Sequence, residues 1–163
     1  MRRLALVVVV AMWAGACASG GGVHGSTAPT APRSRGREAE AAVGHRIVAD
    51  ALDQRGVPYR NGGASPKGFD CSGLVAYVLA QHGVTMPRQT RAQYDVGRKI
   101  DRDDIQPGDL VFFSTVAAGA SHVGIAVDAD EFVHAPSSNG IVRVERLTLP
   151  YWSRRYVGTR RVR

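Results

Sequence analysis

The first apolar pattern along the chain is helical. Apolar side chains recur every three or four residues in the segment 43–52, and Gly56 follows as a helix stop. The segment 57–68 contains five glycines and prolines, which indicate a loop. A second apolar stripe begins after Asp70, a favourable N-cap, and ends at Gly83. Two helices joined by a loop are therefore predicted.

Beyond a short helix expected between Gln89 and Gly97, the pattern becomes that of strands. Compact or alternating apolar runs lie at 110–113, 122–127, 132–135, 141–144 and 156–162. Helices followed by consecutive strands predict an α+β fold. In this fold, N-terminal helices would pack on an antiparallel sheet of about five to six strands.

The N-terminus has the pattern of an export signal. Two arginines precede an apolar run over 4–13, which is too short to span a bilayer. Small residues at 14–16 form a cleavage site directly before Cys17. Residues 1–16 therefore resemble a lipoprotein signal peptide, with Cys17 acylated as the first residue of the mature chain. Cleavage by ordinary signal peptidase after the same small residues is the alternative.

A linker is predicted between this signal and the folded domain. Segment 18–37 consists mainly of small and polar residues, with Val23 its only large apolar side chain. Such a segment cannot bury enough apolar surface to fold. As a flexible coil it would reach roughly 25 Å from a membrane surface. The expected organisation is a signal peptide over 1–16, a lipidated cysteine and linker over 17–37, and one domain over 38–163.

Charge narrows the possible partners of the exported chain. The 163 residues carry a formal net charge of +7, which becomes +5 after the signal is removed, because residues 1–16 hold two arginines and no acidic residue. A basic exported protein suits a polyanionic cell envelope. Export, together with scattered arginines that lack interleaved aromatic residues, argues against a nucleic-acid partner.

Cysteine usage indicates a functional thiol. Cys17 and Cys71 are the two cysteines of the chain. If Cys17 carries lipid, Cys71 is an unpaired thiol in an oxidising compartment. Cys71 directly follows the N-cap Asp70, so free backbone N–H groups and the helix dipole are expected to lower its pKa. A small buried side chain, or a disulfide with an unlipidated Cys17, would also explain this cysteine.

Two of the five histidines lie on one predicted hairpin. If the turn is 128–130, Gly124 pairs with His134, so His122 and His134 share a face with α-carbons on the order of 7–8 Å apart. Gly124 and Ala126 on that face would leave room for a helix to approach. A one-residue slip of the register would separate the two imidazoles.

These residues form the set that cysteine–histidine chemistry requires. Cys71 is the candidate nucleophile, His122 the candidate base, and His134 the group that orients the base. A metal site built from the same three residues is an alternative, although no closely spaced ligand pair supports it.

The segment 69–75, Phe-Asp-Cys-Ser-Gly-Leu-Val, resembles the nucleophile motif of the NlpC family of cell-wall cysteine peptidases, which have a compact papain-like fold. Five further segments resemble motifs of the family and occur in the order that the family has them. One precedes the nucleophile segment, at 56–63, and four come after it, at 86–88, 107–113, 121–125 and 132–135. The resemblance extends over roughly 43–161. Met86, where the family usually has Leu, and Ala126, where an aromatic is common, are departures outside the proposed chemistry.

The resemblance also implies roles for four residues around the thiol. Tyr59 would lie beside the nucleophile and help to hold an oxyanion or orient the substrate, together with the backbone N–H of Cys71. Asp70, Ser72 and Arg88 match family positions that shape the site. An ordinary N-cap, first-turn residue and salt-bridge partner would explain the same three residues.

The expected function is that of a peptidoglycan hydrolase without cofactor or metal. It would be a cysteine endopeptidase that cuts D-glutamyl–diamino acid or D-alanyl–diamino acid bonds through an acyl-enzyme. We expect a monomer bound to the envelope by its lipid, at the outer membrane facing the periplasm in a Gram-negative cell. A non-catalytic wall-binding lipoprotein, and a thiol acyltransferase or amidase with a non-wall substrate, are the alternatives.

Overall fold

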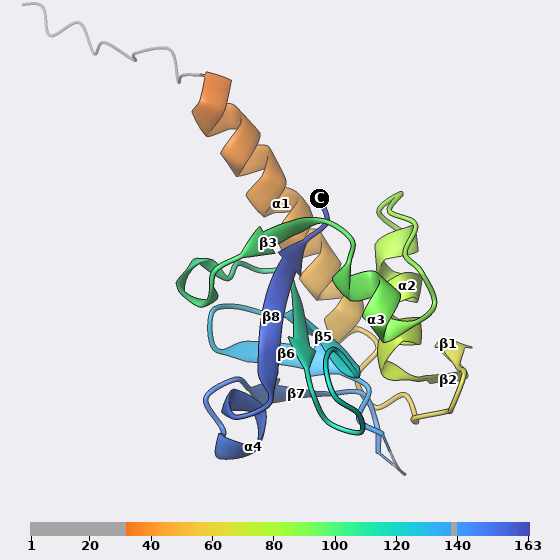
Figure 1. Cartoon of the computed structure of the whole chain (residues 1–163). Coiled ribbons are helices and arrows are strands. Elements are labelled where there is room, and N and C mark those ends of the chain that lie inside the picture. The colour runs from red at the N-terminus through yellow and green to blue at the C-terminus, as the bar shows by residue number, and fades with distance from the viewer. Residues whose placement is uncertain (1–31, 138–139) are drawn as a thin grey trace, which may run out of the picture.

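The computed structural model describes residues 32–137 and 140–163 (Figure 1). The predicted signal peptide over 1–16, Cys17 and the first part of the linker lie outside these residues. Helix α1, Pro32–Leu52, begins ahead of the domain start expected at residue 38. Proline is well tolerated in the first turn of a helix, and several strong helix formers follow it, so the end of the predicted linker is helical instead.

The remaining elements follow the predicted order of helices and then strands. Two short helices come after α1, namely α2, Cys71–Ala80, and α3, Thr90–Tyr94, and a third, α4, Pro150–Ser153, precedes the last strand. The strands are β1, Ala64–Ser65; β2, Gly68–Phe69; β3, Arg98–Ile100; β4, Leu110–Phe113; β5, His122–Ala126; β6, Glu131–His134; β7, Arg143–Arg146; and β8, Tyr156–Arg161. The sequence pattern did not predict β1, β2, β3 or α4. Among the described residues, no helix is both long and apolar enough to cross a membrane.

Within the described residues, six strands form one antiparallel sheet in the order β3-β8-β4-β5-β6-β7, while β1 and β2 pair separately. The α+β prediction is therefore confirmed. The β5–β6 hairpin has the predicted register, because Ile125 lies opposite Val133 and Ala126 lies opposite Phe132. At the turn, the Val127 N–H donates to the Glu131 carbonyl at 2.8 Å.

The two faces of the sheet carry different cores. The face toward α1 and α2 is mainly aliphatic, and Val123 and Ile125 of β5 lie in it with Leu74 and Val78 of α2. The opposite face, covered by α4, carries a cluster in which the aromatic side chains Phe113, Phe132 and Trp152 pack with aliphatic ones such as Leu147. Alternation along β5 therefore directs His122 away from the helical core.

The room that Gly124 was expected to leave for a helix is taken up at that position by strand β6. A Cβ atom on Gly124 would lie 2.5 Å from a ring carbon of Phe132 and 3.2 Å from Cβ of His134. The space is thus filled by the neighbouring strand's own side chains. Helix α2 packs on the other face, where Val123 and Ile125 project.

A buried carboxylate ties the C-terminus to the rest of the fold. Asp109 accepts hydrogen bonds from Arg161 through both oxygens at 2.7 Å, and from Arg163 at 2.9 Å. Arg163 also donates to the Glu40 carbonyl of α1 at 3.0 Å. The turn before β4, strand β8 and helix α1 are therefore held at one point.

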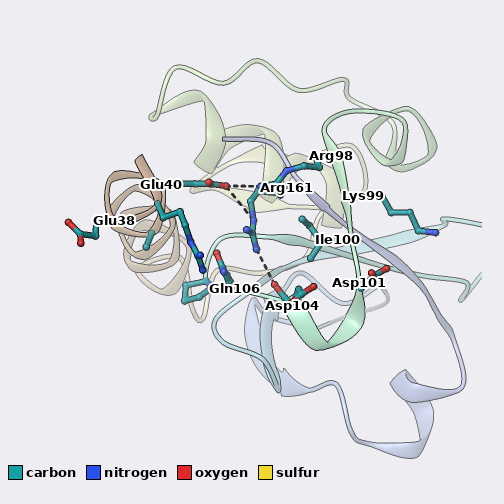
Figure 2. Close-up of a pocket in the computed structure, with 12 residues that line it drawn as sticks. Glu38, Glu40, Arg98, Lys99, Ile100, Asp101, Asp104, Gln106 and Arg161 are labelled. Atoms are coloured by element: carbon teal, nitrogen blue, oxygen red, sulfur yellow. Dashed lines mark hydrogen bonds and ion pairs between the residues drawn. The ribbon is translucent and has the colours of Figure 1, made fainter. Parts of the chain in front are cut away.

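Beside this anchor, α1, β3 and the 3₁₀ turn Arg102–Asp104 enclose a hollow of about 610 Å³ (Figure 2). Arg161 donates to the Asp104 carbonyl at 3.1 Å, and the Glu40 carboxylate lies 3.1 Å from Arg98. Acidic and basic side chains both line this hollow, and their ion pairs join α1 to the sheet.

Candidate active site

Local packing fixes the start of α2 and so presents Cys71. The Asp70 backbone is extended (φ −93°, ψ 176°), and its carboxylate accepts a hydrogen bond from the Gly73 N–H at 2.7 Å. Glycine is required at 73, because a Cβ there would overlap the Gly63 carbonyl oxygen. The loop before the nucleophile is thereby pressed against the first turn of the helix.

The Cys71 thiol is free and partly buried. Its sulfur lies 3.6 Å from the Thr90 hydroxyl, and backbone N–H groups of Val123 and Ser72 also reach it. Burial raises the pKa of this thiol, the Asp70 charge adds to that rise, and these hydrogen bonds only partly oppose it. The expected lowering is therefore wrong, because desolvation of the thiolate outweighs the helix start.

The two predicted histidines meet as a buried pair. The Nε2 atom of His122 lies 2.8 Å from Nδ1 of His134, and the rings are nearly perpendicular at 86°. Burial, and next the nearby His134, lower the pKa of His122 to about 3, while Glu145 acts in the opposite direction. His122 is thus neutral near pH 7 and can accept a proton.

Strand β5 links the surroundings of the thiol to the imidazole pair. The backbone N–H that reaches the Cys71 sulfur belongs to Val123, the residue directly after His122. Strand β5 begins at His122, whose side chain belongs to the histidine pair. The next residue, Val123, contacts Cys71 of α2 through its backbone N–H. The neutral imidazole at this strand end can accept a proton, and its lowered pKa makes it a weaker base than a free histidine.

Asp70, Ser72 and Arg88, the three residues expected to shape the site, form hydrogen bonds with one another. Arg88 donates to both oxygens of Asp70, at 2.8 and 2.6 Å, and to the Ser72 hydroxyl at 2.8 Å. The Gly62 N–H donates to Asp70 at 3.0 Å. Burial alone would raise the pKa of Asp70, but the bonds from Arg88 and Gly73 bring it below its usual value. This network fixes the glycine-rich loop.

Tyr59 belongs to the same electrostatic environment. Burial raises the pKa of its phenol, and the charges of Cys71 and Asp70 raise it further, while Arg88 lowers it. Tyr59 is thereby kept as a protonated hydroxyl, which can donate a hydrogen bond.

Sequence reasoning missed Thr90, Trp152 and Glu145. The Trp152 indole stacks on His122 with ring centroids 5.4 Å apart, and its N–H donates to Glu145. An oxygen of Glu145 lies 3.5 Å from Nε2 of His134. The β6–β7 register places Glu145 opposite Phe132, and no local pattern predicts that pairing.

A cavity of about 350 Å³ adjoins His122 on the α4 side of the sheet. Its lining includes Arg143, Glu145, Leu149, Tyr151 and Trp152. Among the residues that the structure describes, no group of three or more His, Cys, Asp or Glu side chains is placed to hold a metal ion.

This arrangement of helix and sheet is the papain-like fold of a class of cysteine peptidases. The profile of the NlpC/P60 family matches residues 56–161, so the chain belongs to the NlpC/P60 family. Two solved structures share the fold. A Staphylococcus aureus protein of the NLP/P60 family, described as similar to lipoprotein, has a TM-score of 0.66 and 35% identity, and the match covers 74% of this chain and 41% of that one. The NlpC/p60 domain of the peptidoglycan hydrolase SagA has a TM-score of 0.60 and 38% identity, covering 64% and 89%.

Curated relatives are similar over most of the domain. The murein DD-endopeptidase MepS/murein LD-carboxypeptidase of Escherichia coli is 40% identical over 121 residues, 74% of this chain and 63% of that protein. The probable endopeptidase NlpC of Escherichia coli is 38% identical over 122 residues, 71% and 79% of the two chains. The matched region is thus less than two thirds of the first relative's length.

Proposed function

We propose that this protein is a murein endopeptidase that cleaves amide bonds in peptidoglycan peptides with Cys71 as its nucleophile. The observation that carries the proposal is the buried His122–His134 pair, at 2.8 Å, at the strand end that also contacts the Cys71 sulfur. Membership of the NlpC/P60 family and similarity to murein endopeptidases support the substrate class.

The reaction begins with a neutral thiol, because burial raises the pKa of Cys71. His122 takes the thiol proton as sulfur attacks the peptide carbonyl carbon, which forms the C–S bond. The C–N bond then breaks, and the His122 imidazolium gives its proton to the leaving amine. Water, activated by the same imidazole, hydrolyses the thioester and releases the thiol. His134 holds the His122 ring in place throughout.

The negative charge that develops on the carbonyl oxygen needs hydrogen-bond donors. The backbone N–H of Cys71 lies at a helix start, where it has no partner within the helix. The Tyr59 hydroxyl, which stays protonated, is the second candidate donor. Two such donors would stabilise the tetrahedral oxyanion more than the planar carbonyl.

Two bonds in the wall are candidates for cleavage. The similarity to MepS, a murein DD-endopeptidase, favours the D-alanyl–diamino acid cross-link. A gamma-DL-glutamyl hydrolase of Bacillus subtilis, 39% identical over 119 residues, covering 71% of this chain and 28% of that protein, keeps the D-glutamyl bond as the second candidate. The masses of the released fragments distinguish the two.

We also place the enzyme in the cell envelope, held by a lipid on Cys17 and working as a monomer. The cleavage pattern before Cys17 and the relatives' wall-directed activity support export. Metabolic labelling with a radioactive fatty acid tests the anchor, because a Cys17→Ser variant should lose the label. Label that persists in this variant would contradict acylation at Cys17.

The decisive experiment incubates the mature chain without its lipidated cysteine, residues 18–163, with isolated peptidoglycan under reducing conditions. We expect mass spectrometry to identify peptide fragments released by the native protein and none released by the Cys71→Ala variant. His122→Gln should lose at least about a hundredfold in rate, since general base catalysis is worth roughly that much or more.

A second histidine provides the matched control. His82, which follows α2, has its Nε2 atom 2.8 Å from Oδ2 of Asp50 in α1 and takes no part in the histidine pair, so His82→Gln should retain activity. Release of no fragments by any protein, with a Cys71 that thiol reagents do not modify, would favour the wall-binding lipoprotein. A reactive Cys71 without fragment release would instead favour an acyltransferase or amidase.

A further inference from the structure

The histidine pair is ambiguous as it stands, because two neutral imidazoles can share one proton in two ways. Either His122 donates from Nε2 to Nδ1 of His134, or the reverse occurs across the same 2.8 Å. The first arrangement leaves Nδ1 of His122 without a proton and able to act as a base. In the second, Nδ1 of His122 already carries a proton, and the ring cannot accept one there.

A carboxylate lies behind the pair. Glu145 extends from β7 toward His134, and its Oε2 atom lies 3.5 Å from Nε2 of that buried imidazole. Among the described residues, no group lies within hydrogen-bond distance and angle of this nitrogen. At this distance the contact is electrostatic rather than a short hydrogen bond.

The carboxylate is held in place from two further directions. Arg143 approaches its other oxygen, with Nε at 2.7 Å and Nη2 at 2.6 Å. The Trp152 indole N–H donates to Oε2, the oxygen that faces His134. Glu145 retains an exposed fraction of 19%, and its pKa is lowered to about 2, first by His134, so it is ionised at neutral pH.

We infer that Glu145 is a positioning residue for the proposed reaction: its carboxylate selects the protonation pattern of the His122–His134 pair that leaves His122 free to accept the thiol proton. This inference rests on the proposed function of Cys71 and His122. An ionised carboxylate only accepts protons, so it favours N–H on Nε2 of His134 and disfavours a lone pair there. Nδ1 of His134 must then accept from Nε2 of His122.

The same charge acts on the step itself. Proton transfer from Cys71 turns His122 into an imidazolium, and a negative charge behind His134 stabilises that cation. A histidine alone would provide less stabilisation than a carboxylate, and Glu145 supplies the missing charge through His134. The described charged and titratable groups that act on this site are His122 of β5, His134 of β6, and Arg143 and Glu145 of β7.

Replacement of Glu145 tests this inference. Glu145→Gln keeps the shape but removes the charge, so kcat/KM on peptidoglycan should fall about ten- to hundredfold. Because Glu145 raises the pKa of His122, the acid limb of the pH profile should move to lower pH in this variant. Glu145→Asp, which keeps the charge, should leave the acid limb near its native position.

A neighbouring ion pair gives the matched control. Arg146, also on β7, binds Asp130 at 2.6 Å on the exposed side of the strand. Asp130→Asn should leave both rate and pH profile unchanged. An unchanged rate and acid limb in Glu145→Gln, or an equal rate loss in Asp130→Asn, would overturn the inference.

Two further measurements separate this inference from the proposed function and from misfolding. Alkylation of Cys71 by iodoacetamide needs no substrate, and it should be slower near pH 7 in Glu145→Gln than in the native chain. In the native chain, ¹⁵N NMR should find the His134 proton on Nε2. A proton on Nδ1 of His134, or equal alkylation rates in a folded variant, would overturn the role of Glu145 even if peptidoglycan is not the substrate.

Discussion

Asp109 and Asp70 are both aspartates held by arginine, but they lie in different parts of the molecule. Asp109 is fully buried, and two arginines from the C-terminal end of the chain bind it. Asp70 lies at the start of α2, and its one arginine partner among the described residues, Arg88, has a side chain that is 41% exposed. Water can therefore replace part of the Asp70 network but none of the Asp109 network.

The contrast teaches how the same chemistry serves two purposes. Around Asp109, every partner belongs to an element far from Cys71, so the network holds α1, the β4 turn and β8 together. Around Asp70, the partners are the loop at Gly62, the first turn of α2 and Arg88. The second network fixes the geometry beside the thiol and is expected to matter more for activity than for stability.

The largest expected effect on stability is that of Asp109→Asn. The change removes the carboxylate that faces two buried guanidinium groups, of which Arg161 retains Glu40 at 3.7 Å, and breaking a buried pair in this way costs about 3–5 kcal/mol of unfolding free energy. Urea denaturation measures the loss. The folded fraction of this variant should alkylate Cys71 at the native rate. A changed rate would show that Asp109 influences the candidate active site.

A smaller effect on stability, about 1–2 kcal/mol, is expected for Asp70→Asn, because asparagine still caps α2 while the half-exposed ion pair is lost. Its effect on kcat/KM should be larger, about ten- to hundredfold, since the loop beside Cys71 is released. Peptidoglycan digestion measures this ratio. An Asp70→Asn variant that loses stability but no activity would erase the distinction between the two networks.

The pH dependence sharpens the same comparison. The folded-state pKa of Asp70 is lowered, so its contribution to stability is present above the unfolded value near 4 and is lost as pH falls through the folded value. The stability difference between native protein and Asp70→Asn should therefore be seen at pH 7 and shrink toward pH 2–3. A difference that grows on acidification would show that the charge of Asp70 does not stabilise the fold.

The smallest effect belongs to an exposed member of the ion pairs around α1. Arg98, whose side chain is 61% exposed, pairs with Glu40 at 3.1 Å, so Arg98→Gln should cost less than about 1 kcal/mol. Thermal unfolding of this variant beside Asp109→Asn measures the contrast. Similar losses in the two variants would mean that burial does not set the strength of the Asp109 network.

Much of the site could be predicted because it is encoded locally. The Asp70 N-cap, the start of α2 at Cys71 and the hairpin register depend on neighbours within a few residues, and all three predictions are confirmed. The meeting of His122 and His134 follows directly from that register and the two-residue repeat of a strand. The start of α1 was placed too late, because small and charged residues beyond a proline can form either linker or helix.

What the sequence by itself determined is the α+β order, the start of α2 at Cys71 and the pairing of the two imidazoles. The tertiary structure alone decided which face of the sheet each group occupies, the direction of the Cys71 pKa, and the approach of Trp152 and Glu145 to the histidines. The physical reason is range. Caps and registers are set between near neighbours, whereas desolvation sums over every atom that surrounds a group, and the contact from Glu145 depends on how β7 and α4 fold back over β6.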